Sequence, residues 1–365
     1  MRESKPVALL KEMANIASFP RQEKELANYV KNKLLAAGLE VYEDDAAQKL
    51  GGCSGNILAY KPEAKKEENI LQPFPGQVLL VAHLDRISAA TSTAKINQDK
   101  YLTGSGNTNL GADNLAGISI ILSLIKDATV EIPSGWGIAL TVAEEIGLLG
   151  VQQIPADFLA RFSQALVLDG EAPGGIIFNK EPAITVFSLL PSLELTRAEA
   201  RLLLQQVKDQ IQAQTKKIKL IEINSSLPAV NIKHSGLLAA IRAPQAMARN
   251  YWRTVLSKIL KKGAFKITDL MTEEIFSYPG VSFNCQNRWL QKLKEALSKY
   301  NSQVKFSLSS GMSEASVLTA RGLPAVNLGI GIKEAHSKEE KVEIAGLHNI
   351  IATLRELAWM SHQLN

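Results

Sequence analysis

Two histidines and five carboxylates in this sequence stand where they could gather into one metal site. They are His83, Asp85, Asp113, Glu144, Glu145, Asp169 and His336. Imidazole and carboxylate groups together form a ligand set for zinc or a similar divalent ion. Carboxylates that gather closely repel one another unless cations balance their charge. With so many ligands, two ions that share a bridging carboxylate are the economical arrangement.

The residues before these side chains predict the elements that would carry them. A continuous apolar run, typical of a strand buried on both faces, occupies residues 78–82, and further buried strands are expected at residues 137–143, 165–168 and 325–328. With a helix expected over residues 118–125, the alternation predicts an α/β fold with a largely parallel central sheet. Sites in such sheets form at the carboxyl ends of the strands. The candidate ligands follow the apolar runs or open the helix, so we expect them to meet at one edge.

Strand geometry predicts different roles for neighbouring side chains. Residues two apart in a strand point the same way, so the Asp85 carboxylate can accept a hydrogen bond from the second ring nitrogen of His83. Adjacent residues point in different directions, so one of Glu144 and Glu145 can bind metal while the other acts as a base. Each residue alone has an ordinary explanation, such as a helix N-cap for Asp113. Their joint occurrence at strand ends favours the metal site.

The middle of the chain has a different pattern and predicts a second domain. Strands are expected at residues 183–189, 219–223, 237–241 and 265–276, with helices at 196–216 and 244–262. The order β-α-β-β-α-β is the ferredoxin-like pattern. A chain of 365 residues is also long for a single core. We therefore expect an α+β lid domain at residues 183–280, inserted into a catalytic domain formed by residues 1–182 and 281–365.

Composition argues against several classes of protein. Apolar residues make up 46% and charged residues 21% of the chain, as in soluble globular proteins. The net charge of +5 comes from scattered lysines and arginines, so no nucleic-acid partner is expected. No apolar run of about 18 residues occurs, so no membrane association is expected. Cys53 and Cys285 form no C-x-x-C pair and the N-terminus lacks a secretory signal pattern, which favours a cytoplasmic location.

Five motifs in order resemble one known superfamily. They are His83-Leu-Asp85, Gly111-Ala-Asp-Asn-Leu-Ala-Gly117, Ala143-Glu-Glu-Ile-Gly-Leu-Leu-Gly150, Leu168-Asp-Gly170 and, near the C-terminus, His336. Together they are similar to the di-zinc exopeptidases, which include aminoacylases, carboxypeptidases of the G2 type and peptidase T. Residues 144–150 and 169–175 are most similar to the peptidase T-like branch. The resemblance covers nearly the whole chain and implies a zinc-peptidase fold with an inserted ferredoxin-like lid.

The resemblance also implies which residues hold the two ions. His83, Asp113 and Asp169 would surround one ion. Asp113, Glu145 and His336 would surround the other, so Asp113 would bridge the two. The ions would be zinc, with cobalt or manganese as alternatives. The peptide bond after the bridging residue, between Asp113 and Asn114, would be cis.

Further residues receive a role from the same resemblance. Asp85 would orient His83, and Glu144 would be the general base that takes a proton from a water shared by the two ions. The segment at residues 227–242 is similar to the lid segment that faces the substrate. It places Asn231 and Arg242 against the peptide, where a planar guanidinium can bind a carboxylate with two hydrogen bonds. Relatives often dimerise through this lid, so a homodimer is possible.

Three positions depart from the superfamily pattern. Residues 187–196 contain no histidine where relatives carry one that helps to hold the transition-state oxygen. Residues 310–314 read Ser-Gly-Met-Ser-Glu in place of Gly-Gly-Ser/Thr-Asp, and Arg86 stands where relatives have threonine. The predicted function is a metal-dependent exopeptidase acting on small peptides, close to a tripeptide aminopeptidase. The alternatives are a deacylase or carboxypeptidase of the same chemistry, or a metal-loaded binding protein with impaired catalysis.

Overall fold

The chain divides into two compact units, which are described separately. The computed structural model describes residues 3–61, 77–87, 94–97, 100–105, 108–125, 133, 135–191, 205, 209, 219–223, 237–243, 270–309 and 311–362. The first unit comprises Met1–Asn179, Phe283–Ser307 and Ser313–Asn365. The second unit comprises Lys180–Ser282 and Leu308–Met312.

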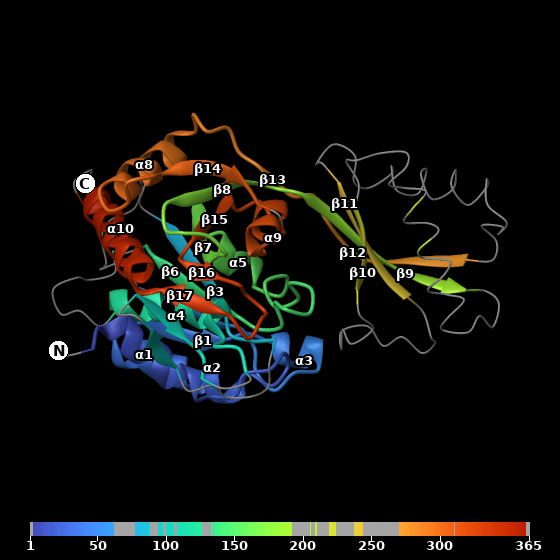
Figure 1. Cartoon of the computed structure of the whole chain (residues 1–365), viewed down its shortest axis with the longest axis horizontal. Helices are drawn as coiled ribbons and strands as arrows, with labels where there is room; N and C mark the ends of the chain where they lie inside the picture. Colours follow the sequence, from blue (N-terminus) through green and yellow to red (C-terminus); the bar gives the residue numbers. More distant parts are fainter. Residues whose placement is uncertain are drawn as a thin grey trace. The chain divides into compact units, whose positions relative to one another are not determined.

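A mixed sheet organises the first unit (Figure 1). Among the described residues its strand order is β1-β2-β6-β3-β7-β15-β8-β13, and β14 pairs with β8. Strands β6, β3, β7 and β15 are mutually parallel, and the pairs at both flanks are antiparallel. The predicted, largely parallel central sheet is confirmed. The strands are β1 (Glu40–Glu43), β2 (Ile57–Tyr60), β3 (Val78–His83), β6 (Gly137–Thr141), β7 (Gln164–Gly170), β8 (Ile176–Glu181), β13 (Val281–Ser282), β14 (Lys305–Leu308) and β15 (Ala325–Gly329).

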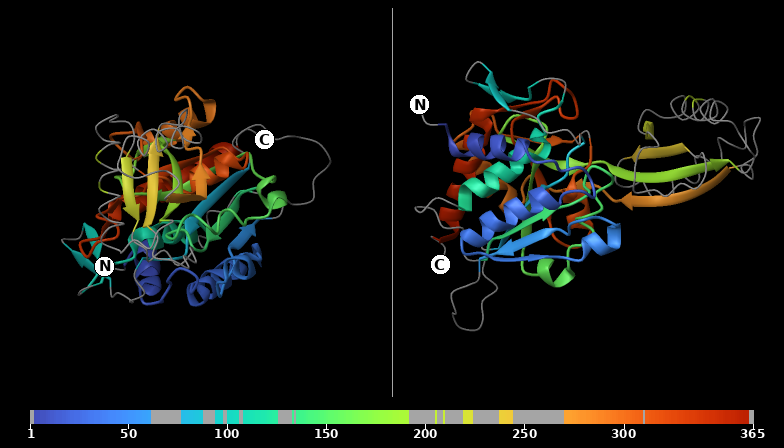
Figure 2. Two further views of the ribbon diagram at one scale, coloured as in Figure 1. Left: turned by 90° about the vertical axis from the view of Figure 1, so that its right-hand side faces the viewer. Right: turned by 90° about the horizontal axis from the view of Figure 1, so that it is seen from below.

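Helices pack on this sheet and bury its central strands. Every residue of β3, β6 and β15 is buried, as their continuous apolar sequences require. Helix α4 packs against β3 and β7, and α9 packs against β7 and β15. Helices α1 and α2 contact α4, and Figure 2 shows these three close together. The described helices of the unit are α1 (Lys5–Ala14), α2 (Lys24–Ala36), α3 (Ala46–Leu50), α4 (Ala112–Ile125), α5 (Ala156–Leu159), α8 (Arg288–Ser298), α9 (Glu314–Ala320) and α10 (Ile344–His362).

Helix α4 begins earlier than the predicted residue 118, but its first turn is irregular. Asp113 and Asn114 have non-helical backbone angles, so the regular part of the helix follows them. Residues 115–124 are all buried, because this apolar helix lies between the sheet and helices α1 and α10. The break leaves Asp113 at the end of α4 that faces the carboxyl ends of the strands.

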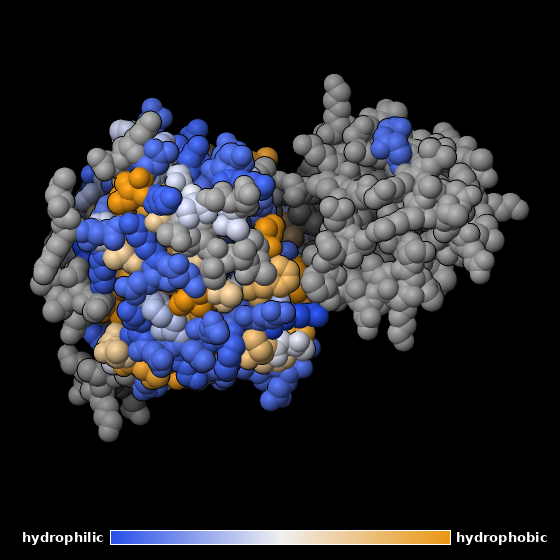
Figure 3. Space-filling view, turned by 60° about the horizontal axis from the view of Figure 1, so that its bottom comes forward, coloured by the Kyte–Doolittle hydropathy of each residue, from blue (hydrophilic) through white to orange (hydrophobic). Residues whose placement is uncertain are grey.

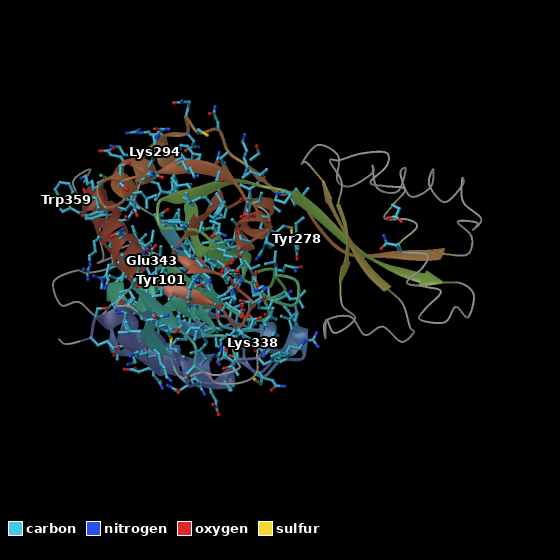
Figure 4. The ribbon with its side chains drawn as sticks, viewed as in Figure 1. Tyr101, Tyr278, Lys294, Lys338, Glu343 and Trp359 are labelled. Carbon is cyan, nitrogen blue, oxygen red and sulfur yellow. The ribbon has the colours of Figure 1, made fainter. Side chains whose placement is uncertain are left out.

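A second, smaller sheet in this unit was not predicted from the sequence. Its order is β16-β17-β5-β4, and the strands are β4 (Lys95–Asn97), β5 (Tyr101–Thr103), β16 (Ile332–Lys333) and β17 (Lys341–Glu343). Tyr101 pairs with Glu343 in the register of β5 and β17, and Figure 4 shows the two side by side. The Lys333 and Lys341 ammonium groups lie 5.1 Å and 5.7 Å from the Tyr101 ring centroid. The sheet therefore anchors both ends of the β16–β17 connection, which carries His336.

The second unit contains an antiparallel sheet. Its order is β10-β11-β9-β12, and the strands are β9 (Ala183–Pro191), β10 (Lys219–Ile223), β11 (Leu237–Ala243) and β12 (Leu270–Tyr278). All four strands of the predicted β-α-β-β-α-β pattern are present, with ends shifted by a few residues. The helices expected at residues 196–216 and 244–262 fall almost wholly outside the described residues.

The face of the first unit that Figure 3 shows is largely hydrophilic. On the face shown in Figure 3, hydrophobic residues form separate small spots among polar ones. Exposed large apolar side chains of this unit include Leu35 and Trp359, which come from different helices. Within the described part of the chain, none of the helices has the length and apolarity that a membrane crossing needs.

Candidate metal centre

His83 is almost completely enclosed within the cluster at the strand ends. It is the last residue of β3, and its side chain is 1% exposed. Its Nε2 atom lies 2.9 Å from Oδ1 of Asp113, 3.5 Å from Oδ1 of Asp169 and 3.9 Å from Oε2 of Glu144. Asp169 belongs to the end of β7, the parallel neighbour of β3. The predicted meeting of strand ends therefore brings an imidazole and three carboxylates together.

Asp113 faces two histidines at once. While Oδ1 points to His83, its Oδ2 atom lies 3.0 Å from Nε2 of His336. The same His336 nitrogen lies 3.1 Å from Oε1 of Glu145. The peptide bond between Asp113 and Asn114 is cis, as the resemblance implied. One carboxylate thus stands between two clusters, the position that a bridging ligand occupies.

Three different kinds of element deliver these side chains. His83 and Asp169 come from strand ends, and Glu144 and Glu145 follow β6 directly. Asp113 comes from the broken first turn of α4. The connection between β16 and β17 brings His336, whose side chain is 46% exposed, so the cluster is open on that side.

The chemistry of this donor set fits divalent cations. Two groups have ligand atoms within 4.8 Å of one another: His83 with Glu144 and Asp169, and His83 with Asp113 and Glu145. Oδ1 of Asp169 and Oε1 of Glu145 are buried, yet neither has a hydrogen-bond partner of ordinary geometry among the described residues. Buried carboxylate oxygens normally accept hydrogen bonds or bind metal. The residues present therefore fit the two ions implied by the sequence.

Carboxylates lie close together within the cluster and repel one another, and a bound cation would relieve this repulsion. Burial lowers the pKa of His83, but the carboxylates around it more than offset this and hold it well above its usual value. Hydrogen bonds to Asp113 and Glu145 raise the pKa of His336 to about 11. Burial, together with the charge of Asp113, raises the pKa of Asp169 well above its usual range. Negative charges are crowded here, and the positive charge of bound cations would offset them.

The position of Asp85 corrects the predicted hydrogen bond to His83. Nδ1 of His83 lies 3.0 Å from the backbone carbonyl oxygen of Asp85, and 3.6 Å from its carboxylate oxygen. The carboxylate instead accepts the backbone N–H groups of Glu144 and Glu145, both at 2.9 Å. Because β3 ends at His83, the alternation of side chains in a strand does not extend to Asp85. Asp85 still holds the His83 ring, but through its main chain.

Glu340 is a further buried residue of the site that sequence reasoning missed. Its Oε2 atom accepts the backbone N–H of Gly111 at 2.6 Å, and its Oε1 accepts that of Asp113 at 3.1 Å. Glu340 is 1% exposed and follows His336 in the β16–β17 connection. It therefore ties the segment of the bridging ligand to the segment of His336. Its sequence, Lys-Glu-Glu-Lys, resembles a solvated turn and gives no sign of burial.

Arg86 is buried next to this contact. It is 1% exposed, and its guanidinium donates to the backbone carbonyl oxygen of Ile16, beyond the end of α1. Gly111 has a left-handed φ of 74°, and any side chain there would collide with Cδ of Arg86. Arg86, one of the departures from the superfamily pattern, therefore packs directly against Gly111 in the segment that carries Asp113.

The predicted substrate residues Asn231 and Arg242 are not tested by this geometry. Arg242 lies in β11, opposite Ile184 of β9 and Lys219 of β10. Asn231 lies outside the described residues, and so do residues 192–196 of the segment at 187–196 where the superfamily histidine is missing. Both substrate assignments stay predictions.

An α/β fold with this cluster at its strand ends defines a metal-dependent hydrolase. Residues 79–360, more than half of the chain, match the model of Peptidase family M20/M25/M40. The chain therefore belongs to this family and is a metallopeptidase, which confirms the superfamily predicted from the five motifs.

Solved structures share the fold along the whole chain. The aminopeptidase PepT from Bacillus cereus ATCC 10987 is 22% identical, covers 97% of this chain and 98% of its own, and has a TM-score of 0.75. A tripeptidase from Staphylococcus aureus subsp. aureus Mu50 is 19% identical, covers 98% of both chains, and has a TM-score of 0.77. The protein YqjE of Bacillus subtilis is 24% identical over an alignment of 380 positions, which covers 95% of this chain and 96% of YqjE.

Proposed function

We propose that this metallopeptidase is an exopeptidase that removes the amino-terminal residue of small peptides, tripeptides above all, with Glu144 as the general base. The position of Glu144 carries the proposal. Its Oε2 atom lies 3.9 Å from Nε2 of His83, farther than the nearest oxygens of Asp113 and Asp169 at 2.9 Å and 3.5 Å. The two nearer carboxylates would supply the ligands beside His83, which leaves Glu144 for proton transfer.

Two bound divalent ions would polarise the scissile carbonyl and stabilise the negative charge that develops on its oxygen. Glu144 would take a proton from the attacking water onto its carboxylate and deliver it to the leaving amine. Burial, with the charges of Glu145 and Asp169, raises the pKa of Glu144 well above its usual value against the opposing effect of His83. A carboxylate with a raised pKa is a stronger base at neutral pH.

The ligand roles follow the contacts of each side chain. His83, Asp113 and Asp169 would hold one ion, and Asp113, Glu145 and His336 the other, while Asp85 would position His83 and Glu144. Imidazole with carboxylate suits zinc, and cobalt or manganese would suit the same donors. The metal content after incubation with each ion, measured by elemental analysis, tests this choice.

The aminopeptidase direction draws support from the similar structures. One of them is an aminopeptidase and another is a tripeptidase. By the superfamily resemblance, Asn231 and Arg242 of the lid at residues 183–280 would bind the peptide and its carboxylate. We further propose that this lid forms a homodimer and that the enzyme works in the cytoplasm. Sedimentation of the purified protein tests the dimer, and cell fractionation tests the location.

One substrate panel tests the proposed activity. It contains free-amino dipeptides and tripeptides, amino-blocked peptides and N-acetyl amino acids, each assayed with added zinc, cobalt or manganese. We expect turnover of the free-amino set, with release of the first residue. The variant Glu144→Gln has a side chain of nearly the same shape as the parent and measures the background rate of cleavage in each preparation. A metal-loaded protein that cleaves only N-acetyl amino acids would be a deacylase, and one that cleaves nothing would be a binding protein.

A further inference from the structure

The segment that carries the general base is held by side-chain oxygens at four successive backbone N–H groups. The N–H of Val142 donates to Oδ1 of Asn56 at 3.0 Å. The N–H of Ala143 donates to Oε1 of Glu23 at 3.0 Å. The next two N–H groups, of Glu144 and Glu145, donate to the Asp85 carboxylate. Backbone N–H groups this close to the end of a strand usually donate to backbone carbonyl groups. Here four side-chain oxygens accept them instead, and we call these acceptors the frame of residues 142–145.

Ala143 occupies a backbone conformation that this frame must maintain. Its φ is 53°, in the left-handed region that residues with a Cβ atom rarely adopt. Ala143 directly precedes Glu144, so its dihedral angles set the direction in which Glu144 and Glu145 leave β6. A relaxation of φ at this residue would swing both side chains away from the cluster.

Glu23 reaches this point from a remote part of the chain. It is the N-cap residue of α2 and is completely buried. The same Oε1 atom that accepts the N–H of Ala143 also accepts that of Arg21 at 2.8 Å. Arg21 has a φ of 68°, so one oxygen holds two residues that are both in the left-handed region. Arg21 is also the third residue of a turn in which the Gln22 N–H donates to the Phe19 carbonyl oxygen at 2.7 Å, so the shared acceptor matters chiefly for Ala143.

The contact depends on an oxygen in the right place more than on charge. Burial, and next the charge of Asp85, raises the pKa of Glu23 to about 7. The second oxygen, Oε2, is buried and finds no hydrogen-bond partner among the described residues. An amide in place of the carboxylate would keep Oε1 as the acceptor. It would also remove a negative charge beside Asp85.

We propose that Glu23 is a positioning residue of the peptidase, which fixes the backbone of Ala143 and so aims Glu144 at the substrate. This inference rests on the proposed function, because it assumes that Glu144 is the base. Catalytic groups must be held close to their productive geometry, and misplacement by about 1 Å can cost about 100-fold in rate. Within the described part of the chain, the hydrogen bonds of the Glu23 side chain go to the backbone of Arg21 and Ala143 and not to a candidate ligand, so its role needs no contact with the peptide.

The test compares three substitutions of Glu23, which separate the effects of side-chain length, negative charge and complete loss of the carboxylate. Glu23→Gln keeps the acceptor oxygen, Glu23→Asp keeps the charge but shortens the reach, and Glu23→Ala removes both. We expect kcat of Glu23→Gln to stay within about threefold of the parent with parental metal content. In the other two variants kcat should fall about 10- to 100-fold with KM unchanged, and the metal content should fall as well, because Glu145 is displaced together with Glu144. Thr353→Ala, at a buried residue of α10 away from the site, controls for general destabilisation.

Amide hydrogen exchange gives a readout that needs no activity. In the metal-free protein, we expect the Ala143 amide to exchange at least about 10-fold faster in Glu23→Asp and at the parent rate in Glu23→Gln. The Leu140 amide, within β6, should be unchanged in both. If the parent cleaves no peptide, the proposed function fails, but this comparison still decides whether Glu23 holds Ala143.

Two results would overturn the proposal. One is a Glu23→Asp protein with parental kcat and parental exchange at Ala143, because the reach of the side chain would then be irrelevant. The other is a Glu23→Gln protein as slow as Glu23→Asp, because the charge of Glu23 would then be the property that matters. Since Glu23→Gln and Glu23→Asp both retain a polar side chain in the buried position, a failure of Glu23→Ala to fold would not prevent the decision.

Discussion

Oδ2 of Asp113 lies 3.0 Å from Nε2 of His336, although Asp113 begins α4 and His336 belongs to the β16–β17 connection. This contact is one half of the arrangement that places Asp113 between two histidines. The His336 side chain is nearly half exposed, so its removal should leave the fold intact.

His336→Ala should therefore lose one of two bound ions. Its fellow ligands Asp113 and Glu145 would remain, but two carboxylates alone hold zinc poorly at this open side. Elemental analysis after zinc incubation and gel filtration should give about one ion per chain in place of about two. His348→Ala, at an exposed histidine of α10 that contacts Ser4, should keep both ions. Two ions in His336→Ala would exclude His336 as a ligand.

Glu144→Gln should separate catalysis from metal binding. Loss of a general base typically lowers the rate about 10²–10⁴-fold, and we expect kcat to fall within that range while both ions stay bound. Glu145→Gln should behave differently, because Glu145 contacts His336 and its loss should reduce the metal content. The measurements are kcat and zinc content on the same preparations. Equal activity in parent and Glu144→Gln would require another base.

The Asp85 carboxylate should matter through the two N–H groups that it accepts. An asparagine has only one oxygen, and its NH₂ group would face a second N–H donor. Asp85→Asn should therefore lose one of the two hydrogen bonds to Glu144 and Glu145, and leave the other donor buried without a partner. An unpaired buried donor costs about 1–3 kcal/mol, so urea denaturation of the metal-free variant should give that loss of unfolding free energy. A stability equal to the parent would mean that these bonds contribute nothing.

The strands and candidate ligands that could be predicted from the sequence are marked by a pattern of neighbouring residues. Largely apolar runs predicted β3, β6, β7 and β15, because burial on both faces leaves few polar positions in a strand, such as Thr141 in β6 and Asn327 in β15. Most of the candidate ligands followed because they stand near the end of such a run or at the start of α4, whereas His336, in the β16–β17 connection, was indicated by the superfamily resemblance. The second small sheet escaped prediction, because strands of two or three residues such as Lys95–Asn97 have no periodicity to detect.

The supporting carboxylates escaped prediction for a different reason. Glu23, Glu314 and Glu340 are buried, yet each lies in an ordinary polar stretch of sequence. Their partners are backbone N–H groups or a hydroxyl group far along the chain, so nothing near them in sequence marks them. The role of Asp85 was predicted in part only, because its placement assumed that β3 continues past His83.

The metal-free protein should lose stability as the pH rises through neutrality. Burial raises the pKa of Glu314 to about 7, and the pKa of Glu23 and of Glu340 is likewise raised to about 7. A carboxyl group with a raised folded-state pKa contributes stability below its unfolded-state pKa and loses it as the pH rises through the folded-state pKa. Thermal unfolding in chelator should therefore occur at a lower temperature at about pH 8.5 than at about pH 6.

Glu314→Gln isolates one of these groups. Glu314 is completely buried and accepts a hydrogen bond from the Thr141 hydroxyl, which an amide oxygen can also accept. The variant should therefore fold normally but show a weaker decline of stability between about pH 6 and about pH 8.5, because one titrating group is gone. Lys292→Gln, at an exposed residue of α8, should leave the pH dependence unchanged. A steeper decline in Glu314→Gln would reverse the assigned sign.

Arg86 and Glu340 should be energetically coupled, because they pack on two sides of Gly111. The Glu340 charge raises the pKa of Arg86 against the larger, lowering effect of burial. Removing one buried charge leaves the other uncompensated, whereas removing both does not. Arg86→Met and Glu340→Gln together should then cost about 0.5–3 kcal/mol less in unfolding free energy than the sum of the single changes.

The matched control is Arg321→Met, which removes a part-buried arginine bound to the carbonyl oxygens of Val151 and Ile154. Its loss of unfolding free energy should add to that of Glu340→Gln within about 0.5 kcal/mol. Additive losses for Arg86 as well would mean that this arginine supports α1 alone and has no part in holding the bridging segment.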